Sequence, residues 1–392
     1  MIESTEAGIE KASELLREGK LVAFPTETVY GLGANALDEE ACLSIFRAKG
    51  RPLTDPLIVH VPDLGSCARL MDTTDEVKEV FDLLAQRFWP GPLTMIVKAS
   101  SLIPSKVTAG TGFVGIRCPA HPLAKRLLEV SQLPLAAPSA NRFGHVSPTS
   151  AEHVLADLGE KDVYVLQGND TVDPDNETCR HGIESTVAKI DVARKVVVLL
   201  RQGAVSEMDL MACLEDAGHT WSTEVLSKAV KMHGTSDGPA GRAVMESDES
   251  SSAGEVAPGQ AITHYAPDVP CFLFCEGGEG SESSSPAEVE ARTMNAQDAK
   301  DSLVVLDFGG QLAGMKEACC GYRELSVTGS APEAARDLFA ALRWSELVPG
   351  AELVLVASVQ GALDQRLGAG VADRIMRATS GKKLDFKITS SS

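Results

Sequence analysis

The sequence predicts an α/β protein with two domains, for three reasons. Its 392 residues exceed the roughly 100–200 residues of an ordinary domain. Short apolar runs alternate with helix-like stretches up to about residue 217, which is the pattern of an α/β domain. A second alternation of this kind begins near residue 269, after a polar stretch rich in Ser, Gly and Glu. We therefore expect domains at 1–217 and 269–392, joined by a flexible linker at 231–268.

In the first domain, apolar runs of strand length are separated by turn residues, and they predict eight strands. The expected strands are 21–24, 57–61, 93–97, 113–117, 135–137, 163–166, 186–190 and 196–200.

Helices are expected between these strands, and residues typical of helix ends mark several of their boundaries. Residues 1–20 are amphipathic, and Asp38 is expected to cap a helix that ends at Gly50. A further helix covers about 76–88. The next begins in the segment SPTSAEHVLADL, either with Thr149 as the first residue of a capping box or with Ser147 followed by proline.

The second domain repeats the pattern with fewer elements. We expect strands at 271–274, 303–308 and 352–356, helices at 332–343 and 363–378, and a surface loop at 276–288.

Composition and charge exclude several classes of protein. With 44% hydrophobic and 23% charged residues, the chain is ordinary for a folded globular protein. Its net charge of −19 argues against a nucleic-acid binder that neutralises phosphates over its whole surface. No apolar run approaches the roughly 20 residues that span a bilayer. We expect no membrane contact, and weak or no direct binding of nucleic acid.

The cysteines and the first segment predict the compartment. The nine cysteines include no C-x-x-C pair, which suits reduced thiols rather than a disulfide framework or a zinc site. Residues 1–20 contain five Glu and lack the apolar centre of a signal peptide, and a mitochondrial presequence would be poor in acids. We expect a cytoplasmic protein with no metal ligands of its own.

The segment FPTETVYGLGANAL, at 24–37, is the first candidate for a functional site. It follows an apolar strand, where α/β folds place ligands. Thr26 and Thr28 alternate and can face one cavity, while Gly31 and Gly33 permit positive φ or a close approach of backbone. A plain structural turn is the competing interpretation.

The segment KGRPLTDPLIVHV, at 49–61, is the second candidate. Pro52 favours an extended Arg51, so Lys49 and Arg51 can point to the same side and clamp a phosphate. Alternatively, Lys49 complements the dipole of its helix and Arg51 is solvated. His60 lies on the strand face opposite Leu57 and can reach the same cavity, or it is a structural histidine.

Two further segments carry polar groups at strand ends. In FVGIRCP, at 113–119, Arg117 can receive a carboxylate or form a buried structural ion pair. In LAAPSANRFGHVSP, at 135–148, Ser139 and Asn141 repeat the alternating arrangement. Ser147 can donate to a phosphate or cap the following helix.

Together the four segments favour phosphoryl or nucleotidyl chemistry. They contain hydrogen-bond donors and cations, but no Ser-His-Asp order, no H-E-x-x-H and no paired cysteines. Such a site holds anions and positions them.

These segments, with others, resemble the YrdC-like threonylcarbamoyl-AMP synthases in their two-domain form. The linker end PGQAITHYAPDVP (258–270) resembles the two-domain members. The other matching segments follow the family's order: PTETVYGLGANAL (25–37), KGRPLTDPLIVHV (49–61), FWPGPLT (88–94), VGIRCPAHPLAKRLL (114–128), APSANRFGHVSPT (137–149), GIESTVAKI (182–190) and VVLLRQGAVS (197–206).

The resemblance implies a fold and a reaction. The fold is a twisted mixed α/β sheet with a deep, basic, concave cavity, followed by a smaller Rossmann-like α/β domain. The reaction joins L-threonine, bicarbonate and ATP, with Mg²⁺, into L-threonylcarbamoyl-AMP and pyrophosphate. The product then serves a separate transferase complex, which modifies tRNA beside the anticodon to threonylcarbamoyladenosine.

The resemblance also assigns roles to residues. The K-x-R and S-x-N tetrad expected to be catalytic is Lys49, Arg51, Ser139 and Asn141. The expected threonine contacts are Thr28, His60, Arg117, the Ala137 backbone and Ser185. The expected ATP contacts are Arg51, Asp55, Ser139, Ser147, Arg201 and, from the linker, Tyr265.

The sequence departs from the family's pattern in three places. Asp55 stands where the family often has Asn, which places a negative charge near the expected nucleotide site. Residues 169–176 resemble an insertion, and PGQAIT replaces the usual PGMKYR before HYAP.

Two other functions remain open from the sequence. One is a double-stranded RNA-binding module of the same fold. The other is a carbamoyltransferase maturation factor with an embedded YrdC-like domain, which would need zinc-finger cysteine pairs and an acylphosphatase-like segment.

Overall fold

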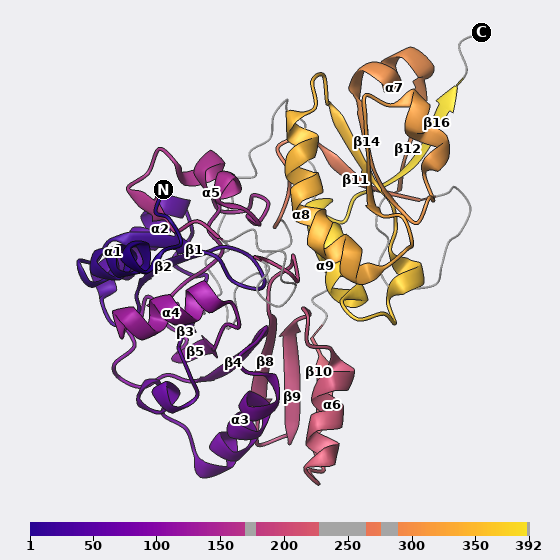
Figure 1. Ribbon diagram of the computed structural model, residues 1–392. Coiled ribbons are helices and arrows are strands. Elements are labelled where there is room, and N and C mark those ends of the chain that lie inside the picture. The colour runs from indigo at the N-terminus through magenta and orange to yellow at the C-terminus, as the bar shows by residue number, and fades with distance from the viewer. Residues whose placement is uncertain (169–177, 227–263, 276–288, 390–392) are drawn as a thin grey trace.

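The computed structural model describes residues 1–168, 178–226, 264–275 and 289–389. They form two α/β domains, coloured indigo to pink and orange to yellow in Figure 1. Within these ranges no helix is both long and apolar enough to cross a membrane. The expected linker lies outside the described residues except for 264–268, and so do the loop at 276–288 and the insertion at 169–176.

The N-terminal domain is built on a twisted ten-stranded sheet that mixes parallel and antiparallel pairs, as expected for the fold class. Parallel pairs such as β3 with β5 and β4 with β8 alternate with antiparallel ones. In spatial order the strands are β10 (Ser222–Val225), β9 (Val196–Arg201), β8 (Thr186–Asp191), β4 (Leu93–Lys98), β5 (Phe113–Arg117), β3 (Ile58–His60), β6 (Leu135–Ala136), β2 (Gly31–Asn35), β1 (Leu21–Phe24) and β7 (Val163–Val165).

Two of these strands differ from the sequence-based expectation. The segment Gly31–Asn35 is not part of a plain turn, because it forms β2 and pairs antiparallel with β1. Gly33 is needed there for close approach rather than for positive φ, because an added Cβ would lie 2.8 Å from the Phe24 ring. Strand β10 pairs with β9 and continues the first sheet beyond residue 217, where the sequence placed the end of the domain.

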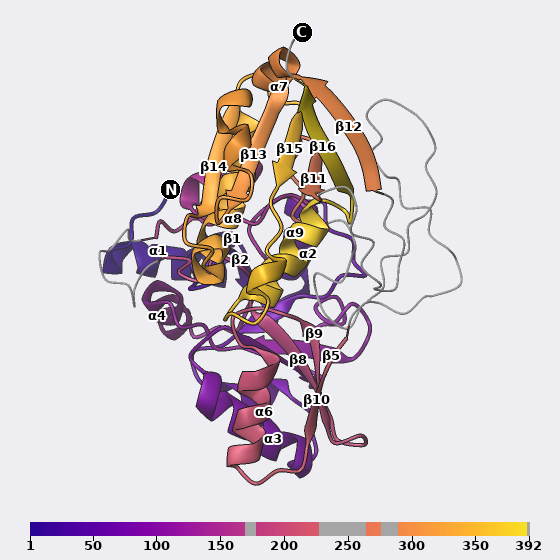
Figure 2. The ribbon, with the colours of Figure 1, turned by 90° about the vertical axis from the view of Figure 1, so that its right-hand side faces the viewer.

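The helices of this domain cover the sheet, and α3 packs beside α6 (Figures 1 and 2). Helices α4 and α6 were not predicted. The helices are α1 (Glu6–Arg17), α2 (Glu39–Lys49), α3 (Asp75–Phe88), α4 (Pro122–Ser131), α5 (Ala151–Leu158) and α6 (Glu207–Asp216), with a 3₁₀ helix η1 (Gly65–Leu70).

The cap signals of α2 are confirmed, and those of α5 are not. The Asp38 carboxylate accepts from the amides of Glu40 and Ala41, and Gly50 ends α2 at φ 64°. For α5 the cap is Ser150, neither Thr149 nor Ser147. The backbone of Ser150 is extended, so its hydroxyl reaches the third amide of the helix.

The C-terminal domain has a six-stranded, all-parallel sheet, which fits the expected Rossmann-like class. The last helix begins at Gly368 rather than at residue 363, because the backbone of Leu367 is left-handed, with φ 72°, and interrupts the helix there. In spatial order the strands are β12 (Val289–Asn295), β16 (Lys383–Thr389), β11 (Cys271–Phe274), β15 (Leu353–Val356), β13 (Leu303–Phe308) and β14 (Gly321–Ser326). The helices are α7 (Ala296–Ser302), α8 (Ala331–Leu347) and α9 (Gly368–Ala378), with η2 (Ala313–Ala318) and η3 (Gln360–Ala362).

The two domains are joined by apolar packing. In Figure 1, α8 and α9 lie on the side of the second sheet that faces the first domain. The buried core of the C-terminal domain includes four residues of the N-terminal domain: Val29, Val146, Ile183 and Ala204. The interface is therefore part of a hydrophobic core, and it holds the domains in one arrangement.

Candidate active site

One narrow cavity in the N-terminal domain collects most of the predicted site residues. It lies where β1, β3 and β5 end, and His264 and Tyr265 of the linker end also line it. The free space is only about 50 Å³, well below the roughly 300 Å³ at the lower end of small-molecule sites. Of the predicted residues, the lining contains Thr28, Arg51, His60, Arg117, Ala137, Ser139, Ser185, Arg201 and Tyr265.

Backbone hydrogen bonds fix the segment that carries Ser139. The Ala137 amide donates to the Ile58 carbonyl at 2.8 Å, and the Ala140 amide donates to the Tyr30 carbonyl at 2.8 Å. Ser139 thus lies opposite Gly31, as an isolated β-bridge next to β2. The S-x-N segment is therefore held by residues at the starts of β2 and β3, which are far from it in the sequence.

Lys49 ties α2 to this segment. Its Nζ donates to the Ser139 carbonyl at 2.7 Å and also to the Asn141 carbonyl, while the Ser139 hydroxyl donates to the Asn141 Oδ1 at 2.5 Å. Burial and the neighbouring Arg51 hold the pKa of Lys49 well below its usual value. Three members of the predicted tetrad are therefore in direct contact, although Lys49 and Asn141 lie behind the cavity lining.

Arg51 is buried, so the interpretation of a solvated side chain is wrong. Its Nη2 lies 2.9 Å from the Asp55 Oδ1, and its Nε donates to the Asp55 carbonyl at 3.1 Å. Burial raises the pKa of Asp55, and the Arg51 charge opposes that rise. Asp55 is not among the residues that line the cavity, and it holds Arg51 in place.

Arg117 forms the buried structural ion pair that the sequence offered as one of two interpretations, and it lies at the cavity as well. It lines the cavity, and its Nη2 also lies 2.6 Å from the Glu27 Oε1 in a fully buried ion pair. Glu27 is held in turn by the Ala120 amide at 3.0 Å. Burial alone would raise the pKa of Glu27, but the Arg117 charge and hydrogen bond lower it.

Apart from Arg117, the side chains at the predicted threonine end are uncharged and buried. Burial, together with the Arg117 charge, lowers the pKa of His60 to about 3. Its Nδ1 has no hydrogen-bond partner among the residues that the structure describes. The hydroxyls of Thr26 and Thr28 lie 2.8 Å apart, and both line the cavity.

On the other side of the cavity, β8 and β9 bring Ser185 and Arg201 together. The Arg201 Nε donates to the Ser185 carbonyl at 3.0 Å, and its Nη2 donates to the Ser185 hydroxyl at 3.1 Å. That hydroxyl also lies 2.8 Å from the Thr94 Oγ1. Ser185 is thereby oriented from two sides.

The sequence missed two residues at this end of the site. Glu184 lines the cavity, and its carboxylate accepts from the Ser147 hydroxyl and from Arg374 of α9. Ser147 neither caps a helix nor lines the cavity, because its hydroxyl is directed at Glu184. Glu184 lies within GIESTV, which is one of the segments that carry the resemblance. Arg374 shares the buried face of α9 with Val371, and an arginine in an apolar stripe is a signal that could have revealed it.

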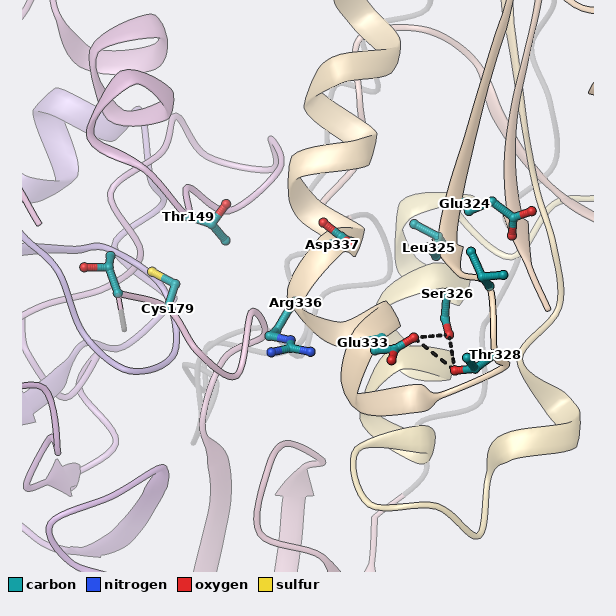
Figure 3. Close-up of a pocket in the computed structure, with 11 residues that line it drawn as sticks. Thr149, Cys179, Glu324, Leu325, Ser326, Thr328, Glu333, Arg336 and Asp337 are labelled. Carbon is teal, nitrogen blue, oxygen red and sulfur yellow. Dashed lines mark hydrogen bonds between the residues drawn. The ribbon is translucent and has the colours of Figure 1, made fainter. Parts of the chain in front are cut away.

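A larger pocket of about 600 Å³ lies between the domains (Figure 3). Thr149 and Cys179 line it on one side, and the first turns of α8 line it on the other. The Ser326 and Thr328 hydroxyls donate to the Glu333 carboxylate at 2.7 and 3.1 Å. These side chains therefore satisfy one another's hydrogen bonds at the start of α8. The pocket contains none of the predicted site residues.

In the described ranges, the one group of donors close enough to hold a metal ion is also at the domain interface. It consists of His145, Asp268 and Glu346. Its donors already bond to one another and to Arg142, because the His145 Nε2 lies 2.8 Å from the Glu346 Oε1 and Arg142 pairs with Asp268. This group is apart from the cavity lining.

A twisted mixed sheet with buried cations, hydroxyls and a neutral imidazole around one cavity defines an α/β enzyme that binds small anionic substrates. Two family models match the chain, one over each domain. One described as telomere recombination matches residues 14–203, and one described as threonylcarbamoyl-AMP synthase, C-terminal domain, matches residues 221–380. The chain belongs to the threonylcarbamoyl-AMP synthase family.

Relatives match the chain over nearly its whole length. The threonylcarbamoyl-AMP synthase of Pyrococcus abyssi is 36% identical over 94% of this chain and 93% of its own. The synthase of Bacillus subtilis is 35% identical over 97% of this chain and 95% of its own. Among solved structures, P. abyssi Sua5 complexed with L-threonine is similar with a TM-score of 0.72, at 30% identity over 98% and 97% of the two chains.

Proposed function

We propose that this chain forms L-threonylcarbamoyl-AMP and pyrophosphate from L-threonine, bicarbonate and ATP, for the threonylcarbamoyladenosine modification of tRNA. Its membership of the synthase family supports the reaction. The observation that carries the assignment of the site is the single cavity that collects nine of the predicted residues. These residues come from segments spread between Thr28 and Tyr265, and packing has no need to gather so many polar groups.

We assign the threonine end of the cavity to Thr28, His60, Arg117, the Ala137 backbone and Ser185. The complex of the P. abyssi relative with L-threonine supports threonine as substrate. Arg117 offers its guanidinium to the carboxylate of threonine, and its pair with Glu27 fixes the direction of the side chain. The neutral His60 leaves the amine of threonine free of a competing positive charge.

We assign the nucleotide end to Arg51, Ser139, Arg201 and Tyr265. Ser147 belongs to this end through its bond to Glu184, and Asp55 belongs through its bond to Arg51. The free space of about 50 Å³ is too small for a nucleotide, so ATP binding requires the His264 and Tyr265 side chains to move.

Mg²⁺ enters this scheme as part of the ATP substrate. The two carboxylates nearest the nucleotide end, Asp55 and Glu184, are each bound by an arginine. They are therefore occupied, and the donors for the ion come from the phosphates and water.

The chemistry follows from positioning. The amine of threonine and bicarbonate give a carbamate with loss of water. An oxygen of the carbamate then attacks the α-phosphorus of ATP, and the bond from that phosphorus to the bridging oxygen breaks as pyrophosphate leaves. Arg51 and Arg201 contribute positive charge close to the phosphates, where the negative charge of the leaving group grows. Lys49 holds the Ser139 segment in place from behind the cavity lining.

The RNA-binding alternative is disfavoured by burial. Lys49, Arg51, Arg117 and Arg201 are each at most 8% exposed, so they cannot contact the phosphates of a duplex. The maturation-factor alternative lacks its zinc-finger cysteine pairs, because no two of the nine cysteines have C-x-x-C spacing. A cysteine pattern without a disulfide framework also supports our assignment of the enzyme to the cytoplasm. We expect its product to pass to a separate transferase complex.

The test is a product assay with the full-length protein. Threonine, bicarbonate and MgATP should yield pyrophosphate only when threonine is present, together with a product of the mass of threonylcarbamoyl-AMP. Omitting bicarbonate is the control. A folded protein that releases no pyrophosphate under these conditions would disprove the proposal.

A further inference from the structure

We propose that Arg374, in the C-terminal domain, is a positioning residue of the nucleotide end of the cavity. It neutralises the cavity carboxylate Glu184 and so lets the cavity accept the phosphates of ATP. This inference rests on the proposed function, and it gives the second domain a defined part in the reaction of the first.

The contacts of Arg374 cross from one domain into the other. Its Nε donates to the Glu184 Oε2 at 2.9 Å, and its Nη1 donates to the Gln202 carbonyl at 2.7 Å. The guanidinium carbon lies 5.5 Å from the centre of the Tyr265 ring. Arg374 is 0% exposed and Glu184 is 6% exposed. Such a pair is closely fixed in direction, because both partners are desolvated and hydrogen-bonded.

The helix that carries Arg374 lies directly against the N-terminal domain. A side chain at Gly370, one turn earlier on α9, would bring a Cβ to 2.7 Å from the Ile183 side chain. A larger residue there would require the Ile183 side chain to shift, so glycine favours the close approach of α9. The sequence of α9 thus combines a contact surface with one inward-pointing cation.

Charge explains why the cavity needs this cation. An unpaired buried carboxylate next to a nucleotide site would repel the phosphates and would oppose the effect of Arg51 and Arg201. Glu184 cannot simply be replaced by an apolar residue without cost, since it accepts the hydrogen bond of the buried Ser147 hydroxyl. Arg374 permits the carboxylate to hold Ser147 while removing its net charge.

The effect should be confined to ATP. Arg374 acts on Glu184 and Tyr265. The side chains of the threonine end are held by other groups: Arg117 by Glu27 and Gly91, Thr28 by Thr26, and Ser185 by Thr94 and Arg201. If Arg374 only stabilised the fold, its substitution would weaken the binding of both substrates together. Arg374→Gln should raise the KM and the Kd for ATP at least about tenfold, and leave the KM for threonine within about twofold.

The decisive variant is the double substitution Arg374→Gln with Glu184→Gln. The amide that replaces the Glu184 carboxylate would still accept from Ser147 through its oxygen, while the uncompensated charge is gone. We expect the double variant to recover most of the ATP affinity that Arg374→Gln loses. Arg374→Lys, which keeps the charge but not the planar fork, should fall between the wild type and Arg374→Gln.

Arg343→Gln is the matched control. Arg343 of α8 also forms a buried pair across the interface, with Asp157 at 2.8 Å, but neither residue lines the cavity. This variant should lower thermal stability as Arg374→Gln does and leave the KM for ATP unchanged.

The measurements are ATP affinity by calorimetry, steady-state kinetics for both substrates, and thermal melting. An equal rise of both KM values, or a double variant no better than Arg374→Gln, would overturn the role of Arg374. If Arg374→Gln does not fold, Arg374→Lys and the double variant carry the same test. A wild type that binds ATP but makes no product would contradict the proposed function alone, because the binding measurements still decide the role of Arg374. A wild type that does not bind ATP would overturn both.

Discussion

Each arginine at the cavity is matched by a buried carboxylate or a hydroxyl. Arg51 has Asp55, Arg117 has Glu27, and Arg201 has Ser185. The sequence revealed the cations, since they lie in polar segments at strand ends. It did not reveal their partners, because Glu27 and Arg117 are 90 residues apart and no local pattern connects them. Asp55 could be connected with Arg51 by spacing alone, and its contact with Arg51 explains how a buried acid is tolerated beside the cavity.

The position of Lys49 predicts a variant with two defects. Lys49→Ala should lower the rate of pyrophosphate release by at least about 100-fold. It should also lower the free energy of unfolding by about 1–3 kcal/mol, because the carbonyls of Ser139 and Asn141 lose their buried donor. Urea titration measures the second effect. Arg47→Ala, on the exposed face of the same helix, is the control and should change neither quantity. A wild-type rate in Lys49→Ala would remove Lys49 from the site.

The buried His60 predicts acid sensitivity. Its pKa is lowered to about 3 in the folded protein, against about 6.5 in an unfolded chain. Between these values the unfolded chain takes up a proton that the folded protein does not, so stability should fall as the pH drops from about 6.5 towards 3. His60→Gln should flatten this part of the stability profile, measured by urea midpoints at several pH values. His219→Gln, at a partly exposed position, serves as the comparison. An unchanged slope in His60→Gln would contradict the prediction.

Among the elements, those with complete local signals were predicted well. Helix α2 has an acidic cap, an apolar face and a final glycine, and all three features are confirmed. Strand β2 was missed, since the sequence GLGAN lacks bulky residues and is buried by its neighbours instead. Strand β12 was missed for the opposite reason. It lies at the sheet edge, and its sequence VEARTMN, which is mostly exposed, has little of the apolar alternation that marks a strand.

The loop before β8 predicts a sensitive contact between elements. Gly182 has φ 67°, and an added Cβ would lie 2.1 Å from the Ala335 carbonyl oxygen of α8. Gly182→Ala should therefore destabilise the protein by clearly more than the roughly 1 kcal/mol of backbone strain. Gly218→Ala is the control, because Gly218 has φ 76° and open space around its position. Thermal melting of both variants separates the backbone strain, which both share, from the collision with α8, which only Gly182→Ala has. Equal losses of melting temperature in the two variants would contradict the close contact.

At the scale of the whole molecule, the sequence predicted two domains but not their interface. The apolar residues Val29, Val146, Ile183 and Ala204 stand in polar motifs, so nothing local marks them as a docking surface. The charged residues of the interface are equally impossible to recognise from the local sequence. Asp157 of α5 receives His145 at 2.9 Å and Arg343 of α8 at 2.8 Å, and the second pair is 186 residues apart.

This charged part predicts a dependence of domain docking on pH. Burial alone would lower the pKa of His145, but its hydrogen bonds to Asp157 and Glu346 raise it above the usual value. A raised pKa means that the stabilisation is fully present below about pH 6.5 and is lost as the pH rises through the folded value. His145→Gln should therefore lower the melting temperature more at pH 6 than at pH 9. Equal losses at both pH values would show that His145 is uncharged in the folded protein.

The ion pair of Arg374 with Glu184 has a consequence for synthesis on the ribosome. The two residues are 190 positions apart, and at about 5–20 residues per second the arginine is added roughly 10–40 s after its partner. During that interval the first sheet can form, but Glu184 lacks its ion-pair partner on α9. From the role proposed for Arg374, we expect a nascent chain to bind nucleotide weakly and to become fully competent only when translation is almost complete.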